Sequence, residues 1–122
     1  MVLDNVLAKI PDENLSVHVV WTPVLRSDNF EATGAAQKFI PDPRALHYWD
    51  GDQNLGKAYG TALELPRGRE LAWDIYFAFE AGVVWGEEVP APSHWAHQLG
   101  MDSRHLGDGT RLREALRAML DR

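Results

Sequence analysis

The first half of the chain alternates between short apolar runs and segments with helical spacing. Residues 16–21 (SVHVVW) are rich in β-branched side chains and nearly continuously apolar, which predicts a strand covered on both faces. Residues 45–49 (ALHYW) predict a second strand. Apolar positions recur at a helical period over about 29–40 and 54–63. The pattern therefore predicts strand, helix, strand, helix.

The second half changes to the alternating period that is typical of strands. Residues 71–79 are rich in aromatic and branched side chains, residues 80–82 (EAG) read as a tight turn, and residues 83–85 (VVW) read as the antiparallel partner strand. Residues 87–109 are rich in Pro, His and Gly and predict a long loop with one helical turn at its histidines. A final amphipathic helix is predicted over about 110–121.

Taken together, these elements predict an α/β fold of order β-α-β-α-β-β-α. The first two strands would be parallel and joined by a right-handed crossover, and a terminal hairpin would complete a central mixed sheet of four strands flanked by helices. A chain of 122 residues with 45% hydrophobic residues can bury one core. We therefore expect a single domain over residues 1–122, with the loop at about 87–109 as an insertion.

Charge and composition narrow the classes of function. Twelve basic residues against 18 acidic ones give a net charge of −6, which disfavours binding to nucleic acid or to an anionic membrane. No segment approaches the ~20 apolar residues of a membrane span, so a soluble chain is expected. A chain with no cysteine carries no disulfide evidence about its compartment, so the cytoplasm is the default expectation. Removal of an earlier leader stays open.

Several segments, in this order, resemble the thioredoxin superfamily over about residues 16–121. Val19-Val20-Trp21 matches the family's strand that ends in Trp before its dithiol. Residues 45–60 (ALHYWDGDQNLGKAYG) resemble the second strand, the Asp and the short helix ending in Tyr-Gly, and residues 75–82 (IYFAFEAG) resemble the hairpin with Gly at its turn. The resemblance implies a thioredoxin-like fold with a binding cleft beyond the first strand.

The chain departs from that family at the residues that carry its chemistry. Thr22 and Leu25 stand where the Cys-x-x-Cys dithiol would be, and Leu25 also replaces the thiolate of the Thr-x-x-Cys pattern of peroxiredoxins. Without any cysteine the protein has no thiolate, which excludes thiol–disulfide oxidoreductase and thiol peroxidase activity. The family's cis-proline position falls at about Asp74, after Trp73, with Pro66 as an alternative after an insertion.

The predicted sheet brings several chemically useful side chains to one edge. Ligands of parallel sheets bind beyond the carboxyl ends of the strands, where the connections diverge. The binding cleft predicted there comprises Trp21, Thr22, Pro23, Trp73, Asp74, His94, Trp95 and His97. Its tryptophans would offer a stacking surface for a small ligand or a peptide. No cofactor is expected.

Two of these histidines are also candidate metal ligands. His94 and His97 would face the same way on one helical turn and, with His105 or Asp74, could supply three ligands to a divalent ion. The His-Glu-x-x-His pattern of zinc hydrolases is absent, however, and His-x-x-His is common by chance. The alternative is that both histidines are surface or capping residues.

Three hypotheses about function therefore stand side by side. The first is a binding module without catalysis that holds a small ligand or peptide in the cleft. The second is an enzyme, with or without a metal, that uses His94, His97 and a partly buried Asp74 of raised pKa as general acid. The third is an interaction protein that forms a homodimer by pairing residues 83–85 as an exposed edge strand.

Overall fold

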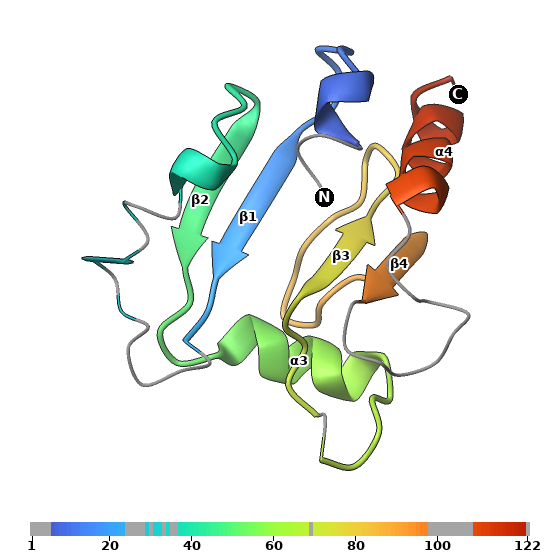
Figure 1. Cartoon of the computed structure of the whole chain (residues 1–122). Helices are drawn as coiled ribbons and strands as arrows, with labels where there is room; N and C mark the ends of the chain where they lie inside the picture. Colours follow the sequence, from blue (N-terminus) through green and yellow to red (C-terminus); the bar gives the residue numbers. More distant parts are fainter. Residues whose placement is uncertain are drawn as a thin grey trace. The chain divides into compact units, whose positions relative to one another are not determined.

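The protein divides into two compact units, which are described separately. In a computed structural model of the whole chain, one unit comprises Asp12–Trp73, and the other comprises Met1–Pro11 with Asp74–Arg122. The structure describes residues 6–23, 29, 31–32, 34, 37–68, 70–97 and 109–121. Figure 1 labels the elements within each unit.

The 12–73 unit is built on two parallel strands. β1 (Val17–Trp21) pairs with β2 (Ala45–Trp49) in the register Val17↔Ala45 to Trp21↔Trp49. The helix α3 (Asn54–Ala62) begins a few residues after the carboxyl end of β2 (Figure 1). The parallel pairing and the helix predicted at 54–63 are thus confirmed.

The region predicted as a helix at 29–40 is described only in part. Glu31, Ala32 and Gly34 are helical, and Gln37–Phe39 form the 3-10 turn η2. Asn29 accepts a hydrogen bond through its side-chain oxygen from the Ala32 backbone N–H at 2.8 Å, as an N-capping side chain does. The other positions of this predicted helix lie outside the described residues.

α3 approaches the following segment closely along a face that carries two glycines. The Ala72 N–H donates to the Gly56 carbonyl at 2.9 Å. A Cβ atom at Gly56 would lie 2.6 Å from Leu71 Cδ1, and one at Gly60 would overlap the Glu70 carbonyl oxygen. Glycine at these two helical positions therefore permits the backbone of residues 70–72 to lie against the helix.

The carboxyl end of α3 closes with a Schellman motif that lacks the usual glycine. The Leu65 N–H donates to the Gly60 carbonyl at 3.0 Å, and the Glu64 N–H donates to the Thr61 carbonyl at 3.1 Å. Glu64 occupies the left-handed position with φ 53°. The two hydrogen bonds satisfy carbonyl groups of the last turn and offset the cost of this conformation.

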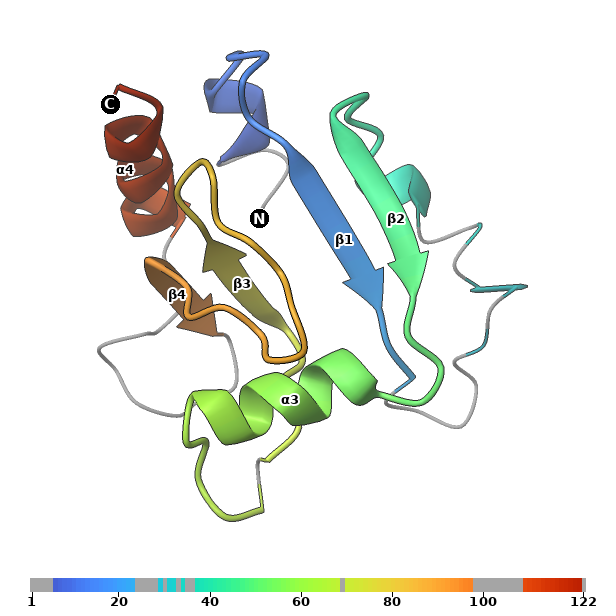
Figure 2. The same ribbon diagram turned by 180° about the vertical axis from the view of Figure 1, so that it is seen from behind.

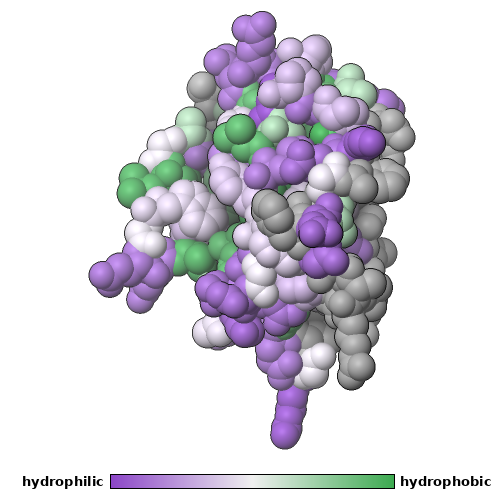
Figure 3. All heavy atoms as spheres, turned by 90° about the vertical axis from the view of Figure 1, so that its left-hand side faces the viewer, coloured by the Kyte–Doolittle hydropathy of each residue, from purple (hydrophilic) through white to green (hydrophobic). Residues whose placement is uncertain are grey.

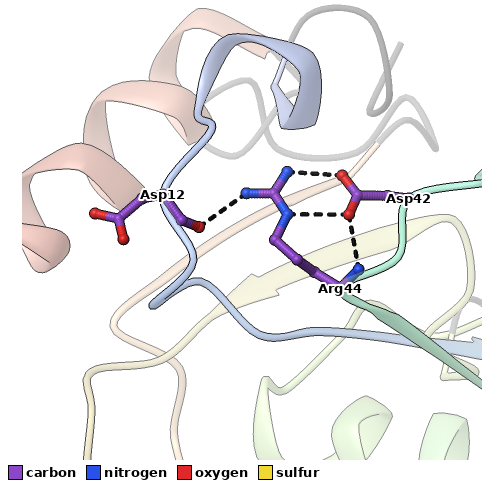
Figure 4. A network of polar contacts seen from close by, with 3 residues as sticks. All are labelled: Asp12, Asp42 and Arg44. Carbon is purple, nitrogen blue, oxygen red and sulfur yellow. Dashed lines mark hydrogen bonds and ion pairs between the residues drawn. The ribbon is translucent and has the colours of Figure 1, made fainter.

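An arginine clamps the chain at the amino-terminal ends of both strands. Arg44 Nη2 and Nε donate to the two carboxylate oxygens of Asp42 at 2.6 and 3.0 Å, and Arg44 Nη1 donates to the Asp12 carbonyl at 3.1 Å (Figure 4). The Asp42 and Arg44 side chains are only 10% and 18% exposed. The hydrogen bonds from Arg44 hold the pKa of Asp42 below its ordinary value.

The second unit combines a small antiparallel sheet with helical segments from both ends of the chain. β3 (Ile75–Ala78) pairs with β4 (His94–His97) in the register Ile75↔His97 to Ala78↔His94. α4 (Gly109–Leu120) lies beside β3 and β4 (Figure 2) and contacts both strands. Its Leu112 is buried. The 3-10 helix η1 (Leu7–Lys9) is tied to α4, because Arg117 Nη2 donates to the Lys9 carbonyl at 3.0 Å. The helix predicted at 110–121 is thus confirmed.

The expected four-stranded mixed sheet is wrong. Within the described ranges, strand pairing forms two separate two-stranded sheets, β1–β2 and β3–β4. Residues 83–85 are not a strand, so the predicted hairpin and the edge strand proposed for a homodimer are both corrected. Val84 is 82% exposed, so its side chain contributes little packing that would hold residues 83–85 in a sheet. The Ser93 N–H instead donates to the Ala78 carbonyl and extends the β3–β4 ladder.

Two further corrections concern the boundaries of the elements in this unit. The strand predicted at 71–79 begins only at Ile75, because Asp74 adopts φ 52°, a left-handed conformation that interrupts extended chain. The helical turn predicted at the histidines of the 87–109 loop is the strand β4. Pairing with β3 decides this, since it satisfies backbone groups that an isolated helical turn leaves to solvent. No helix in the described residues is long and apolar enough to cross a membrane.

The close approach at α3 predicts that Gly60→Ala is strongly destabilising. The added methyl group would displace the Glu70 backbone, so we expect the free energy of unfolding to fall by about 3 kcal/mol. Chemical denaturation measures the change. The matched control is Gly34→Ala, because Gly34 is helical with open space around its Cβ position, and there we expect a gain of about 0.5–1 kcal/mol. Equal effects at both glycines would contradict the close approach of Glu70 to Gly60.

The Arg44 clamp predicts a pH-dependent contribution to stability. A carboxyl group with a lowered folded-state pKa stabilises the fold above its ordinary pKa, and this stabilisation is lost as the pH falls through the lowered value. Arg44→Lys keeps the charge but removes the two-pronged hydrogen bond, so we expect a loss of about 1 kcal/mol at neutral pH. NMR titration should show the Asp42 pKa moving up toward its ordinary value. An unchanged Asp42 titration would contradict the clamp.

Candidate functional site

The eight residues of the predicted cleft fall in both units. Trp21, Thr22, Pro23 and Trp73 belong to the 12–73 unit, and Asp74, His94, Trp95 and His97 belong to the other. Their convergence on one cleft stays a prediction.

The indole of Trp21 is held by a histidine on the neighbouring strand. Trp21 Nε1 donates to His47 Nδ1 at 3.1 Å, and the two rings lie nearly parallel, at 8°, with centroids 6.1 Å apart. An indole N–H can only donate, so His47 Nδ1 is the acceptor and the neutral imidazole carries its proton on Nε2. Both side chains are half-buried. The pair presents an aromatic surface with one further hydrogen-bond donor.

The two residues after β1 are tied to the loop that leads into α3. Thr22 Oγ1 donates to the Asp50 carbonyl at 3.4 Å, and Gln53 Nε2 donates to the Pro23 carbonyl at 2.6 Å. The Asp50 N–H in turn donates to the Trp21 carbonyl at 2.8 Å. Consecutive residues at the end of β1 are thus each fixed by a separate contact.

Asp50 also caps the helix that follows. Its carboxylate oxygens accept hydrogen bonds from the backbone N–H groups of Asn54, at 3.0 Å, and Leu55, at 2.8 Å. A carboxylate on the first-turn N–H groups is favoured by hydrogen bonding and by the helix dipole. One residue therefore connects the end of β1 with the start of α3.

Two other tryptophans of this unit differ in their surroundings. Trp49 pairs with Trp21 in the strand register and is half-buried, and its indole lies 2.9 Å from the Cβ position of Gly51. A larger residue than glycine would collide with this ring in the turn after β2. Trp73, which was expected to contribute to the stacking surface of the cleft, is 41% exposed, so much of its ring lies in solvent.

Asp74 does not have the partly buried position expected of a general acid. It is exposed in the left-handed conformation already described, and its Oδ1 accepts a hydrogen bond from Tyr76 Oη at 3.5 Å. Burial, together with the charge and hydrogen bond of Asp74, raises the pKa of Tyr76 to about 12. Tyr76 is therefore a neutral donor at physiological pH.

The two candidate metal-binding histidines lie on opposite faces of a strand. Side chains alternate along β4, so His94 and His97, three residues apart, point to opposite sides of the sheet. Trp95 shares its side with His97, at a ring-centroid distance of 6.0 Å, and His97 is fully buried. This corrects the expected shared orientation on a helical turn, and His105 lies outside the described residues.

In the described ranges, no three His, Asp or Glu side chains are grouped so that they could hold a metal ion. The residues that matter most at the end of β1 are instead His47, Asp50 and Gln53, none of which belonged to the predicted cleft. The signal for His47 is its register, because a parallel pair in step places it diagonally beside Trp21 on the same face. Asp50 carries the signal of an acidic residue shortly before a helix.

Comparison of the chain with protein-family models, with curated proteins and with solved structures gives no match. The likeness to thioredoxins thus rests on the sequence segments alone.

The double role of Asp50 predicts that its carboxylate stabilises the fold. Asp50→Ala removes the acceptors of two α3 backbone N–H groups, and we expect the free energy of unfolding to fall by about 1–2 kcal/mol. Thermal and chemical unfolding measure this loss. Asp52→Ala is the matched control, because Asp52 receives the Lys57 side chain on its backbone carbonyl, which the substitution retains. A comparable loss in both variants would contradict the capping role.

Proposed function

We propose that the protein is a binding module without thiol chemistry, which holds a small planar ligand or a peptide group at the carboxyl end of β1. The hydrogen-bonded, stacked pair of Trp21 and His47 carries the proposal. The absence of cysteine from the sequence keeps dithiol and peroxidase chemistry out of the proposal.

The residues at the carboxyl end of β1 are held in fixed positions, which supports a binding role. Sites bind well when their groups are held in place before the ligand arrives, since less conformational freedom is then lost on association. Trp21, Thr22 and Pro23 are each fixed by a contact with the β2–α3 segment. Aromatic side chains with a few directed polar groups are the usual lining of small-molecule sites.

The polar groups of this strand end favour a neutral hydrogen-bond acceptor as ligand. His47 Nδ1 is engaged by Trp21, and within the described residues no hydrogen bond occupies Nε2, which is a donor in this tautomer. Among the described residues, Asp50 is the charged side chain that the hydrogen bonds place at this strand end, and it is acidic. A ligand carbonyl or amide next to an aromatic ring fits these features better than an anion does.

The proposal is tested by NMR titration with two small probes, benzamide and N-acetylphenylalaninamide. We expect chemical-shift changes at the Trp21 indole N–H and the His47 ring at millimolar probe concentrations. His47→Phe keeps an aromatic ring but loses the donor, so we expect about 3- to 10-fold weaker binding, the usual effect of one lost hydrogen bond.

Trp85→Phe is the matched control, because Trp85 is an exposed tryptophan outside the site. It should leave the titration unchanged. Shift changes that avoid Trp21, or equal weakening by both substitutions, would contradict the proposal.

A further inference from the structure

The exposed face of the β1–β2 pair carries a serine, a histidine and a tyrosine in a row. Ser16 Oγ lies 3.1 Å from His18 Nε2, and His18 Nδ1 lies 3.0 Å from Tyr48 Oη. Residues in register share a face, so His18 stands beside Leu46, and Tyr48 is its diagonal neighbour. All three polar side chains are exposed to solvent.

This arrangement of a nucleophile, a base and a third group is one that nucleophilic catalysis by serine commonly uses. A serine hydroxyl is a poor nucleophile until a base within hydrogen-bond reach takes its proton, and the base works best when a third group fixes its tautomer and ring orientation. The His18 ring meets both conditions. One nitrogen faces Ser16, the other faces Tyr48, and the imidazole stacks on the tyrosine ring at 5.7 Å and 22°.

We propose that Ser16 is a nucleophile that His18 activates, with Tyr48 as a positioning residue, and that the site accepts acyl groups from activated aryl esters. The proposal requires the His18 tautomer that carries its proton on Nδ1. In that tautomer Nδ1–H donates to the phenolic oxygen of Tyr48, and Nε2 is left to accept the proton of Ser16. The site is independent of the proposed function, because Trp21 and His47 lie on the opposite face of the same two strands.

The reaction balances with water as the only further reactant. Ser16 Oγ attacks the ester carbonyl as its proton moves to His18 Nε2, and the bond from carbonyl carbon to aryl oxygen breaks. The phenol leaves with that proton, and Ser16 carries the acyl group as an ester. Water then attacks this ester, His18 takes and returns a proton, and the products are the carboxylic acid and the free serine.

The surroundings favour an apolar acyl or aryl group. Leu46, the register partner of His18, is 54% exposed, and Tyr48 is 46% exposed on the same face. On the side of the molecule seen in Figure 3, hydrophobic atoms lie in small groups among hydrophilic ones. An aryl ester could place its ring on Leu46 and Tyr48 while its carbonyl reaches Ser16. Because base assistance alone contributes about 10²–10⁴-fold, we expect a slow reaction.

The test is covalent labelling of the whole protein with an alkyl fluorophosphonate, followed by peptide mass spectrometry. The serine oxygen forms a bond to phosphorus, the P–F bond breaks, and fluoride leaves while His18 takes the proton. We expect Ser16 to be labelled about 100-fold faster than Ser93, an exposed serine on another segment. p-Nitrophenyl acetate should be hydrolysed slowly through an acetyl ester on the Ser16 peptide, and Ser16→Ala should lower this hydrolysis to the uncatalysed rate.

The roles of the partners are separated by further variants. His18→Ala should slow the labelling of Ser16 by about 100-fold, and added imidazole should restore part of the rate. Tyr48→Phe should slow it by about 3- to 10-fold in the native background but have no effect in the His18→Ala background, since Tyr48 acts through His18. Denaturation curves confirm that each variant is folded.

Labelling of Ser16 no faster than that of Ser93, or labelling that is unaffected by His18→Ala, would overturn the proposal. So would an equal effect of Tyr48→Phe in both backgrounds. None of these outcomes bears on the binding of benzamide at Trp21 and His47, so a failure here is distinct from a failure of the proposed function.

Discussion

The in-step parallel pairing of β1 with β2 is the constraint on which the 12–73 unit depends. Because the strands align Val17 with Ala45 and Trp21 with Trp49, alternate residues of both strands share each face. One face carries Trp21 beside His47, and the other carries His18 beside Tyr48. A shift of one residue between the strands would separate both pairs, so both proposed sites rest on this single register.

The ends of the parallel pair are fixed by side chains acting on backbone groups. Arg44 joins the carboxylate of Asp42 to the carbonyl of Asp12 at the amino-terminal ends, and Asp50 links the end of β1 with the first turn of α3. A two-stranded sheet is marginal by itself. These clamps, together with the close approach of residues 70–72 to α3, provide contacts that further strands supply in larger sheets.

The second unit shows how pairing competes with local pattern. Gly82 adopts φ 87°, as a turn requires, yet the chain does not return along β3 at once. Trp85 packs edge-on against Phe79, with ring centroids 5.4 Å apart. The strand that pairs with β3 is β4, which begins 12 residues after Gly82. A local turn signal selects a bend in the chain, but it does not select which later segment forms the ladder.

The sequence by itself determined the elements that depend on neighbours along the chain. The strand endings at Trp21 and Trp49 and the helices near 54–63 and 110–121 follow from short-range periodicity and capping. The composition also shows that the given sequence contains no cysteine and therefore no thiol. Only tertiary structure decided that β3 pairs with residues 94–97, that His94 and His97 face opposite ways, and that Trp21 meets His47. Hydrogen bonds between distant strands set these relations, and no local pattern records which strands will meet.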